Sequence, residues 1–87
     1  MLERDLERKL AAYCRQNEIL FIKLVGMRGI PDRLVVKPHG RVLWMELKTP
    51  TGCLSPAQSY FIRVLKRLGQ DVRVIDNYED GLETINQ

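Results

Sequence analysis

The chain has 87 residues, of which 45% are hydrophobic, and it carries 14 basic against 11 acidic side chains. This length predicts one small domain over residues 1–87, and the lack of an apolar run of about 18 residues excludes a membrane-spanning helix. The charged start, MLERDLERKL, is not expected of a signal peptide, so we expect a cytoplasmic protein with Cys14 and Cys53 as free thiols. The formal charge of +3 permits an anionic partner without requiring one.

Residues 2 to 16 predict an amphipathic helix, because apolar side chains recur at helical spacing. Glu3 and Glu7 lie four residues apart, on one flank of the apolar stripe. Periodicity alone favours Glu7 as an exposed helix glutamate that pairs with Arg4 or Arg8.

Residues 18 to 25, EILFIKLV, predict the first strand. It is apolar on both faces apart from Lys23, so we expect helices to cover both faces. The loop at residues 26 to 29 has two glycines, which allow the backbone to approach a ligand closely. Arg28 in this loop suits a phosphate contact, although a solvated loop arginine explains it equally well.

Residues 29 to 48, GIPDRLVVKPHGRVLWMELK, predict a β-hairpin with its turn at residues 38 to 40. A three-residue turn places Lys37 opposite Arg41 and, counting back along both strands, the acid at position 32 opposite the acid at position 46. Residues 41 to 47 are apolar enough on both faces to predict a central strand.

Asp32, Glu46 and Lys48 share one face of this hairpin, because side chains alternate along a strand. Two opposed carboxylates with Cβ atoms about 5 Å apart repel by roughly 3 kcal/mol at an effective dielectric of about 20. A divalent cation would reverse the sign of this interaction, so the pattern favours a metal site. The alternative is a structural ion pair of Lys48 with Glu46 or Asp32.

Residues 49 to 54 form a polar loop, and three signals then predict a second helix. Ser55 can cap it, Pro56 fits the first helical position, and Gln58 completes a capping box. The helix is expected to continue to Leu68 and to end at Gly69. The capping box alone accounts for Gln58.

Residues 71 to 76, DVRVID, alternate as a fourth strand, and residues 79 to 86 predict a short last helix. The predicted order is αβββαβ(α). The sequence therefore predicts an α/β fold in which helices pack on each side of a small mixed sheet.

A helix that carries Glu7, followed by PD at Pro31-Asp32 and ELK at residues 46 to 48, resembles the PD-(D/E)xK nuclease superfamily. The stretches GIPD, MELKTPTGCLSPAQ and LGQDVRVID are similar to the stand-alone virus-type replication-repair nuclease domain, VRR-NUC. The likeness extends over nearly the whole chain. PD and ELK alone arise often by chance, but GIPD, ELK and the SPxQ helix start at these separations form a specific combination. The resemblance implies a restriction-endonuclease-like core.

The resemblance implies a Mg²⁺ or Mn²⁺ site for phosphodiester hydrolysis. Asp32 and Glu46 would bind the ion through carboxylate oxygens, and the Leu47 carbonyl would be a further ligand. Lys48 would hold or polarise the attacking water and offset the charge that develops at the phosphate.

Two helical residues also match the family pattern. Glu7 matches the acid of the first helix, which would order a metal-bound water or a second ion, and Glu3 competes for that role. Gln58 matches the glutamine of the second helix and would line the site near Lys48. Its capping role does not exclude this, because a residue in the first turn of a helix can face a pocket.

The expected partner is DNA, and basic side chains near the acidic centre would contact its phosphates without reading the bases: Lys9, Lys23, Arg28 and Arg33. By resemblance, we expect a homodimer that nicks branched DNA such as Holliday junctions, in a bacterial or phage-infected cytoplasm. Two alternatives remain. One is a general nicking or restriction-like nuclease with the same core, and the other is a non-catalytic nucleic-acid-binding module.

Overall fold

A computed structural model of the chain describes residues 2–87. Four strands form one mixed sheet in the order β1-β2-β3-β4, in which only β3 and β4 are parallel. The strands are β1 Leu20–Lys23, β2 Arg33–Val36, β3 Val42–Leu47 and β4 Asp71–Ile75. The helices are α1 Glu3–Gln16, α2 Pro56–Arg67 and α3 Tyr78–Asn86, and a 3-10 turn, Pro38–Gly40, joins β2 to β3. The predicted element order is confirmed.

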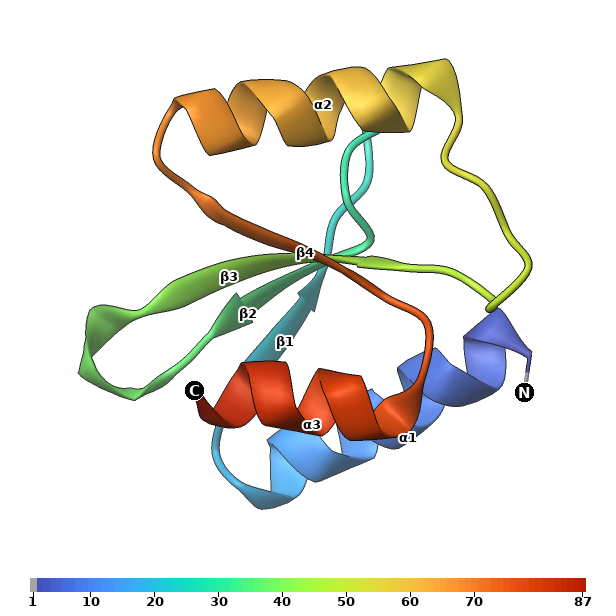
Figure 1. Ribbon diagram of the computed structural model, residues 1–87. Helices are drawn as coiled ribbons and strands as arrows, with labels where there is room; N and C mark the ends of the chain where they lie inside the picture. The colour runs from blue at the N-terminus through green and yellow to red at the C-terminus, as the bar shows by residue number, and fades with distance from the viewer. Residues whose placement is uncertain (1) are drawn as a thin grey trace.

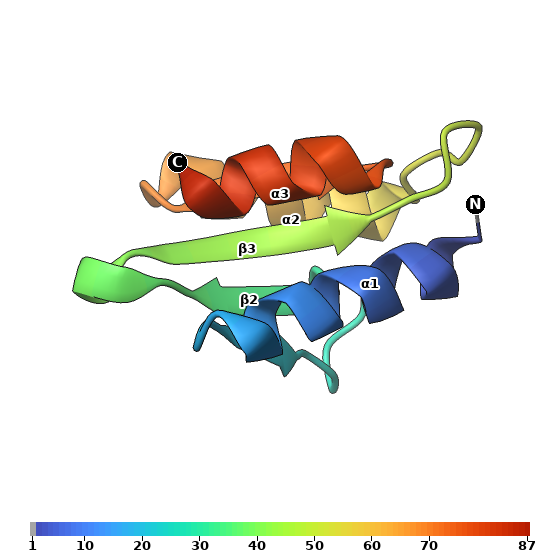
Figure 2. The same ribbon diagram turned by 90° about the horizontal axis from the view of Figure 1, so that it is seen from below.

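The helices form a layer on each face of the sheet. Figure 1 shows α2 on one side of the strands, with α1 and α3 together on the other side. Figure 2 gives the same arrangement from below, where α1 and α3 lie in front of the sheet. The predicted α/β architecture, with helices on both sides of a small mixed sheet, is therefore correct. Across residues 2–87, no helix is both long and apolar enough to span a bilayer.

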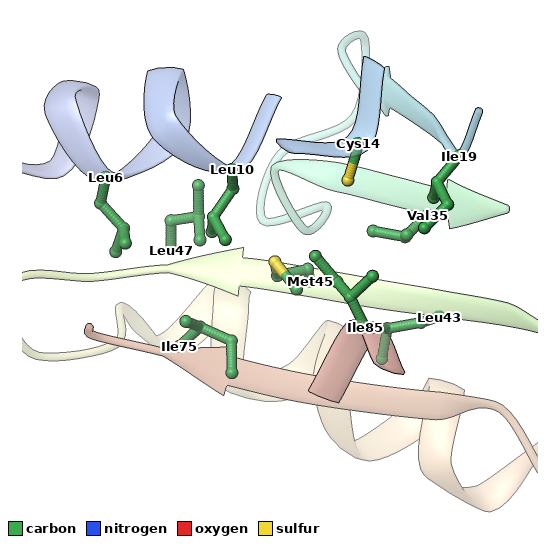
Figure 3. Packing of buried hydrophobic residues seen from close by; sticks show 10 residues of the cluster. All are labelled: Leu6, Leu10, Cys14, Ile19, Val35, Leu43, Met45, Leu47, Ile75 and Ile85. Atoms are coloured by element: carbon green, nitrogen blue, oxygen red, sulfur yellow. The ribbon is translucent and has the colours of Figure 1, made fainter. Parts of the chain in front are cut away.

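The larger core lies between the sheet and the α1–α3 layer. Leu10 and Cys14 of α1 contact the inward side chains of β3, which are Leu43, Met45 and Leu47, and all of these are buried (Figure 3). Alternate residues of β3 therefore enter this core and leave the others for the opposite face. A smaller core under α2 is built around three buried residues, Ile62, Leu65 and Val72.

The hairpin has the predicted register. Val36 pairs with Val42 across the turn, and the Lys37 N–H donates to the Arg41 carbonyl at 2.8 Å. The ladder continues to Arg33 opposite Met45. The next position outward therefore brings residue 32 beside residue 46, as the turn length predicts.

The prediction for the first strand is wrong in its length and in its environment. The strand is only Leu20–Lys23 and forms an edge of the sheet. Its outer face is not covered, because α2 packs over β3 and β4: Leu20 is 60% exposed and Ile22 is 40% exposed. The half of the α2 face that lies over β1, with Leu20 and Ile22, is therefore open to solvent, and we call it the open sheet half.

Candidate active site

Asp32 and Glu46 meet at the end of the hairpin that is remote from its turn. Asp32 precedes β2, and its Oδ2 accepts a hydrogen bond from the Leu47 N–H at 2.8 Å. This bond takes the place of a backbone ladder bond where β2 begins, and it fixes the Asp32 carboxylate against β3. Glu46 lies on β3, between β2 and β4, and its exposed fraction is 1%. The structure therefore brings the two acids together on one face of the sheet.

The Glu46 carboxylate has one partnered oxygen and one free oxygen. Oε2 accepts a hydrogen bond from Gln58 Nε2 at 3.0 Å and lies 3.8 Å from the Lys48 ammonium. Oε1 is the one buried side-chain polar atom without a hydrogen-bond partner among the residues that the structure describes. Burial, followed by the charge of Asp32, raises the pKa of Glu46 to about 8, against the opposing effect of Lys48. The ionised form of Glu46 is therefore unfavourable at neutral pH.

These donors fit a hard divalent cation. Buried polar atoms are normally satisfied, so a carboxylate oxygen without a hydrogen-bond partner, next to a second carboxylate, is a suitable ligand for a cation. Across residues 2–87, histidine, cysteine and acidic side chains do not gather in a group of three that could hold an ion. Mg²⁺ suits such a sparse donor set, because it commonly binds one or two carboxylates and keeps several waters. The Leu47 carbonyl, between Glu46 and Lys48 in the chain, is the remaining predicted ligand.

Gln58 completes the predicted capping box and also contacts Glu46. Its Oε1 accepts from the Ser55 N–H at 2.8 Å, while its own N–H donates to Ser55 Oγ at 3.1 Å, which completes the capping box. The other end of the same amide, Nε2, donates to Glu46. The start of α2 therefore holds one oxygen of Glu46 and leaves the other free.

Comparisons with known proteins show the family of the chain. The model of the VRR-NUC domain matches residues 2–77. The chain belongs to the VRR-NUC family. A relative, "Putative nuclease p44" of Acyrthosiphon pisum secondary endosymbiont phage 1, is 34% identical over 79 residues, which are 88% of this chain and 85% of that protein. A solved structure of a VRR-NUC domain superposes with a TM-score of 0.86 at 23% identity, covering 98% of this chain and 95% of that one, and so shares the fold.

The first-helix acids of this VRR-NUC chain have different surroundings. Glu7 does not pair with Arg4 or Arg8, so that prediction is wrong: its Oε2 accepts from Arg33 Nε at 2.8 Å. Arg8 instead pairs with Asp5 at 3.1 Å. Glu3, not Glu7, contributes to the raised pKa of Glu46. The charge of Glu3 is the weakest of the effects that raise this pKa.

The four cations that were predicted to contact DNA differ in how accessible their charged groups are. Arg33 is held by Glu7, by the Phe21 carbonyl at 2.9 Å and over the Phe21 ring, so its guanidinium is largely committed within the fold. Lys9 lies over the Tyr78 ring, with 5.7 Å from its Nζ to the ring centroid. Lys23 and Arg28 are exposed. Of the four, these last two are the most accessible to a nucleic acid.

The loop between β1 and β2 packs closely against the start of α2 at Gly29. Its φ is +84°, and a Cβ atom at this position would lie 2.5 Å from the backbone of Ala57. The close approach that the glycines permit is therefore made here to α2 rather than to a ligand. This contact joins the segment before Asp32 to the helix that carries Gln58.

Gly29→Ala is expected to lower the free energy of unfolding by about 2 kcal/mol or more, since it combines a left-handed conformation with a backbone clash. Gly26→Ala is the matched control: its φ is +101°, but nothing lies within 4 Å of the added Cβ. It is expected to cost only about 1 kcal/mol. Urea unfolding of both variants measures the difference, and equal losses would contradict a role for the contact with Ala57.

Proposed function

We propose that this VRR-NUC domain is a metal-dependent endonuclease that hydrolyses DNA phosphodiester bonds. The observation that carries the proposal is the buried, unpartnered Oε1 of Glu46 beside the Asp32 carboxylate. Two adjacent carboxylates, one of which has a buried oxygen without a hydrogen-bond partner, are suited to Mg²⁺ or Mn²⁺. When bound, such an ion would polarise the phosphate and lower the pKa of an attacking water.

The side chains of the chain have separate tasks in this scheme. Asp32 and Glu46 would hold the ion, with the Leu47 carbonyl as a further ligand. Gln58 keeps Glu46 oriented by donating to its Oε2, which would leave Oε1 for the ion. Lys48 places a positive charge beside the carboxylates, where it would offset the negative charge that grows on the phosphate. Among the first-helix acids, Glu3 acts on Glu46, while Glu7 orients Arg33.

We also propose a homodimer that acts on branched DNA, such as a four-way junction. The open sheet half around Leu20 and Ile22 supports it, because a free edge strand with exposed aliphatic side chains suits a twofold contact with a second copy. A twofold dimer would present two cutting centres to a symmetric substrate. The phage relative supports a place of action in the cytoplasm of an infected cell.

Cleavage of an end-labelled four-way junction and a matched linear duplex, each with Mg²⁺, Mn²⁺ or EDTA, tests the proposal. We expect symmetric, metal-dependent nicks on the junction, together with a dimeric mass in sedimentation equilibrium. Equal cutting of both substrates would replace junction preference with general nicking. Binding without cutting in any metal would leave a non-catalytic module.

A monomer that still cuts the junction would overturn the dimer proposal. Ile22→Lys provides the matched variant for that part, since it places a charge at the centre of the open sheet half. We expect it to shift sedimentation towards the monomer and to reduce paired cutting more than single nicking.

A further inference from the structure

The outer face of α2 carries cations without acids. Arg63, Lys66 and Arg67 are all exposed, and α2 contains no aspartate or glutamate. Tyr60 is 59% exposed on the same helix, and the Arg63 guanidinium lies 5.7 Å from the centre of its ring. Tyr60, Arg63 and Arg67 form one stripe along the helix, because they recur at intervals of three and four residues. All three are exposed, so the stripe points away from the sheet. The sequence pattern did not predict this stripe.

Ordinary structural roles explain only some of the three cations of α2, which are Arg63, Lys66 and Arg67. Lys66 and Arg67 lie in the last turn, where positive charge is favoured by the helix dipole. Arg63 lies in the middle of the helix, where the dipole gives no such benefit. Within residues 2–87, none of the three forms a salt bridge. Exposed arginines without acidic partners, beside an exposed tyrosine ring, are suited to a polyanion with flat rings.

The charge distribution of the molecule points the same way. Residues 76 to 87, which include α3, carry four acids and no lysine or arginine. α2 lies on the opposite face of the sheet from α3 (Figure 1). This α2 face is also the face on which Asp32, Glu46 and Lys48 project, because Trp44 of the same alternating row packs under α2. A polyanion is therefore attracted to α2, on the side that holds the candidate site, and repelled from α3.

We propose that the stripe formed by Tyr60, Arg63 and Arg67 is a binding site for the nucleic-acid backbone, which extends the substrate contact beyond the cutting centre. The inference rests on the proposed nuclease function. With a rise of 1.5 Å per residue, Arg63 and Arg67 lie roughly 7 Å and 13 Å along the helix axis from Gln58. They are placed to bind phosphates next to the one being cut, while Tyr60 stacks on an unpaired base.

The test measures affinity in EDTA, so that binding is read without cleavage. A fluorescent DNA duplex with a single-stranded arm is titrated with wild type, R63Q/R67Q, Y60A and the control R15Q/R41Q. The control removes the same charge from two exposed residues outside α2, at the end of α1 and beside the β2–β3 turn. Circular dichroism and thermal unfolding verify that each variant is folded, and R63K/R67K tests whether positive charge alone is sufficient.

We expect R63Q/R67Q to weaken binding at least about tenfold at low salt and to reduce the slope of log affinity against log salt by about two, while R15Q/R41Q stays within about twofold of wild type. Y60A is expected to weaken binding only when the single-stranded arm is present. R63K/R67K should retain the salt slope.

Equal losses in R63Q/R67Q and R15Q/R41Q, or no loss in the former, would overturn the inference while wild-type cleavage still supported the nuclease. Wild-type protein that neither binds DNA in EDTA nor cuts it with Mg²⁺ would overturn both.

Discussion

Asp32→Ala and Lys48→Ala are each expected to abolish DNA cleavage, with a loss of at least about a thousandfold, while the protein still folds cooperatively. Asp32 and Glu46 are the two carboxylates that meet at the proposed centre, so the loss of Asp32 would leave one carboxylate and the Leu47 carbonyl to hold an ion. Lys48 supplies the one cation within reach of these acids, 3.8 Å from Glu46 among the residues that the structure describes. Neither function can be taken over by a neighbouring side chain.

The structural cost of both substitutions is small by comparison. Asp32→Ala removes the acceptor of the Leu47 N–H, a loss of about 1 kcal/mol, but it also relieves the repulsion of Glu46. Lys48 is partly exposed and makes no short hydrogen bond to Glu46, so its removal mainly raises the pKa of Glu46 further. Activity and stability are therefore expected to separate.

Single-turnover cleavage of a labelled junction with saturating Mg²⁺ measures the loss, and thermal unfolding measures the fold. Asp71→Ala is the matched carboxylate control, because Asp71 is exposed, pairs with Arg73 and lies at the other end of the sheet. It is expected to keep wild-type cleavage. A variant of Asp32 or Lys48 that cuts at the wild-type rate would remove that residue from the catalytic scheme.

The convergence of the two acids could be predicted because it follows from local rules. The length of the turn sets the pairing register, and strict alternation then decides which side chains share a face. Neither step needs knowledge of how distant elements pack. The same is true of the capping box at Ser55 and Gln58, which depends on four consecutive residues.

The contacts that were missed depend on how helices sit on the sheet. Glu7 and Arg33 are 26 positions apart, and only the angle of α1 across β1 and β2 brings them together. The exposure of Leu20 depends on α2 lying over β3 and β4, which an apolar strand pattern does not encode. The contact of Gly29 with Ala57 likewise depends on where α2 begins.

The burial of Glu46 also depends on how a helix packs on the sheet. Alternation places it on the α2 face, but burial comes from the first turn of α2 above it, where Gln58 binds its Oε2. That burial raises the pKa of Glu46, so the ionised form of this acid is unfavourable in the folded protein at neutral pH. The site therefore arises from a local pattern and a tertiary contact together.

Glu46→Gln is expected to abolish cleavage and, at the same time, to stabilise the metal-free protein. A glutamine keeps an acceptor for Gln58 but carries no buried charge and does not repel Asp32. Since one pKa unit corresponds to about 1.4 kcal/mol, and coupling to Asp32 shares the cost between the two acids, we expect a gain of about 2 kcal/mol at neutral pH. In a domain of this size such a gain raises Tm by roughly 10 °C.

The pH dependence gives the sign of this effect. The pKa of Glu46 rises from 4.5 to about 8 on folding, so the folded state favours the protonated acid. This contribution to stability is fully present below pH 4.5 and is lost as the pH rises towards 8. In EDTA, the Tm difference between Glu46→Gln and wild type should therefore be small at pH 4.5 and should grow up to about pH 8.

Added Mg²⁺ or Mn²⁺ should reverse the difference, because the ion binds the ionised acid in wild type and finds no charged ligand at position 46 in the variant. Wild-type Tm is expected to rise with metal, most strongly above pH 7, while the Tm of Glu46→Gln stays almost constant. A wild-type protein whose stability in EDTA does not fall between pH 5 and 8 relative to the variant would contradict the strained acidic pair. A variant that is stabilised by metal as strongly as wild type would move the ion away from Glu46. Loss of cutting with a gain of stability distinguishes a catalytic acid from a structural one, because the removal of a structural ion pair lowers both.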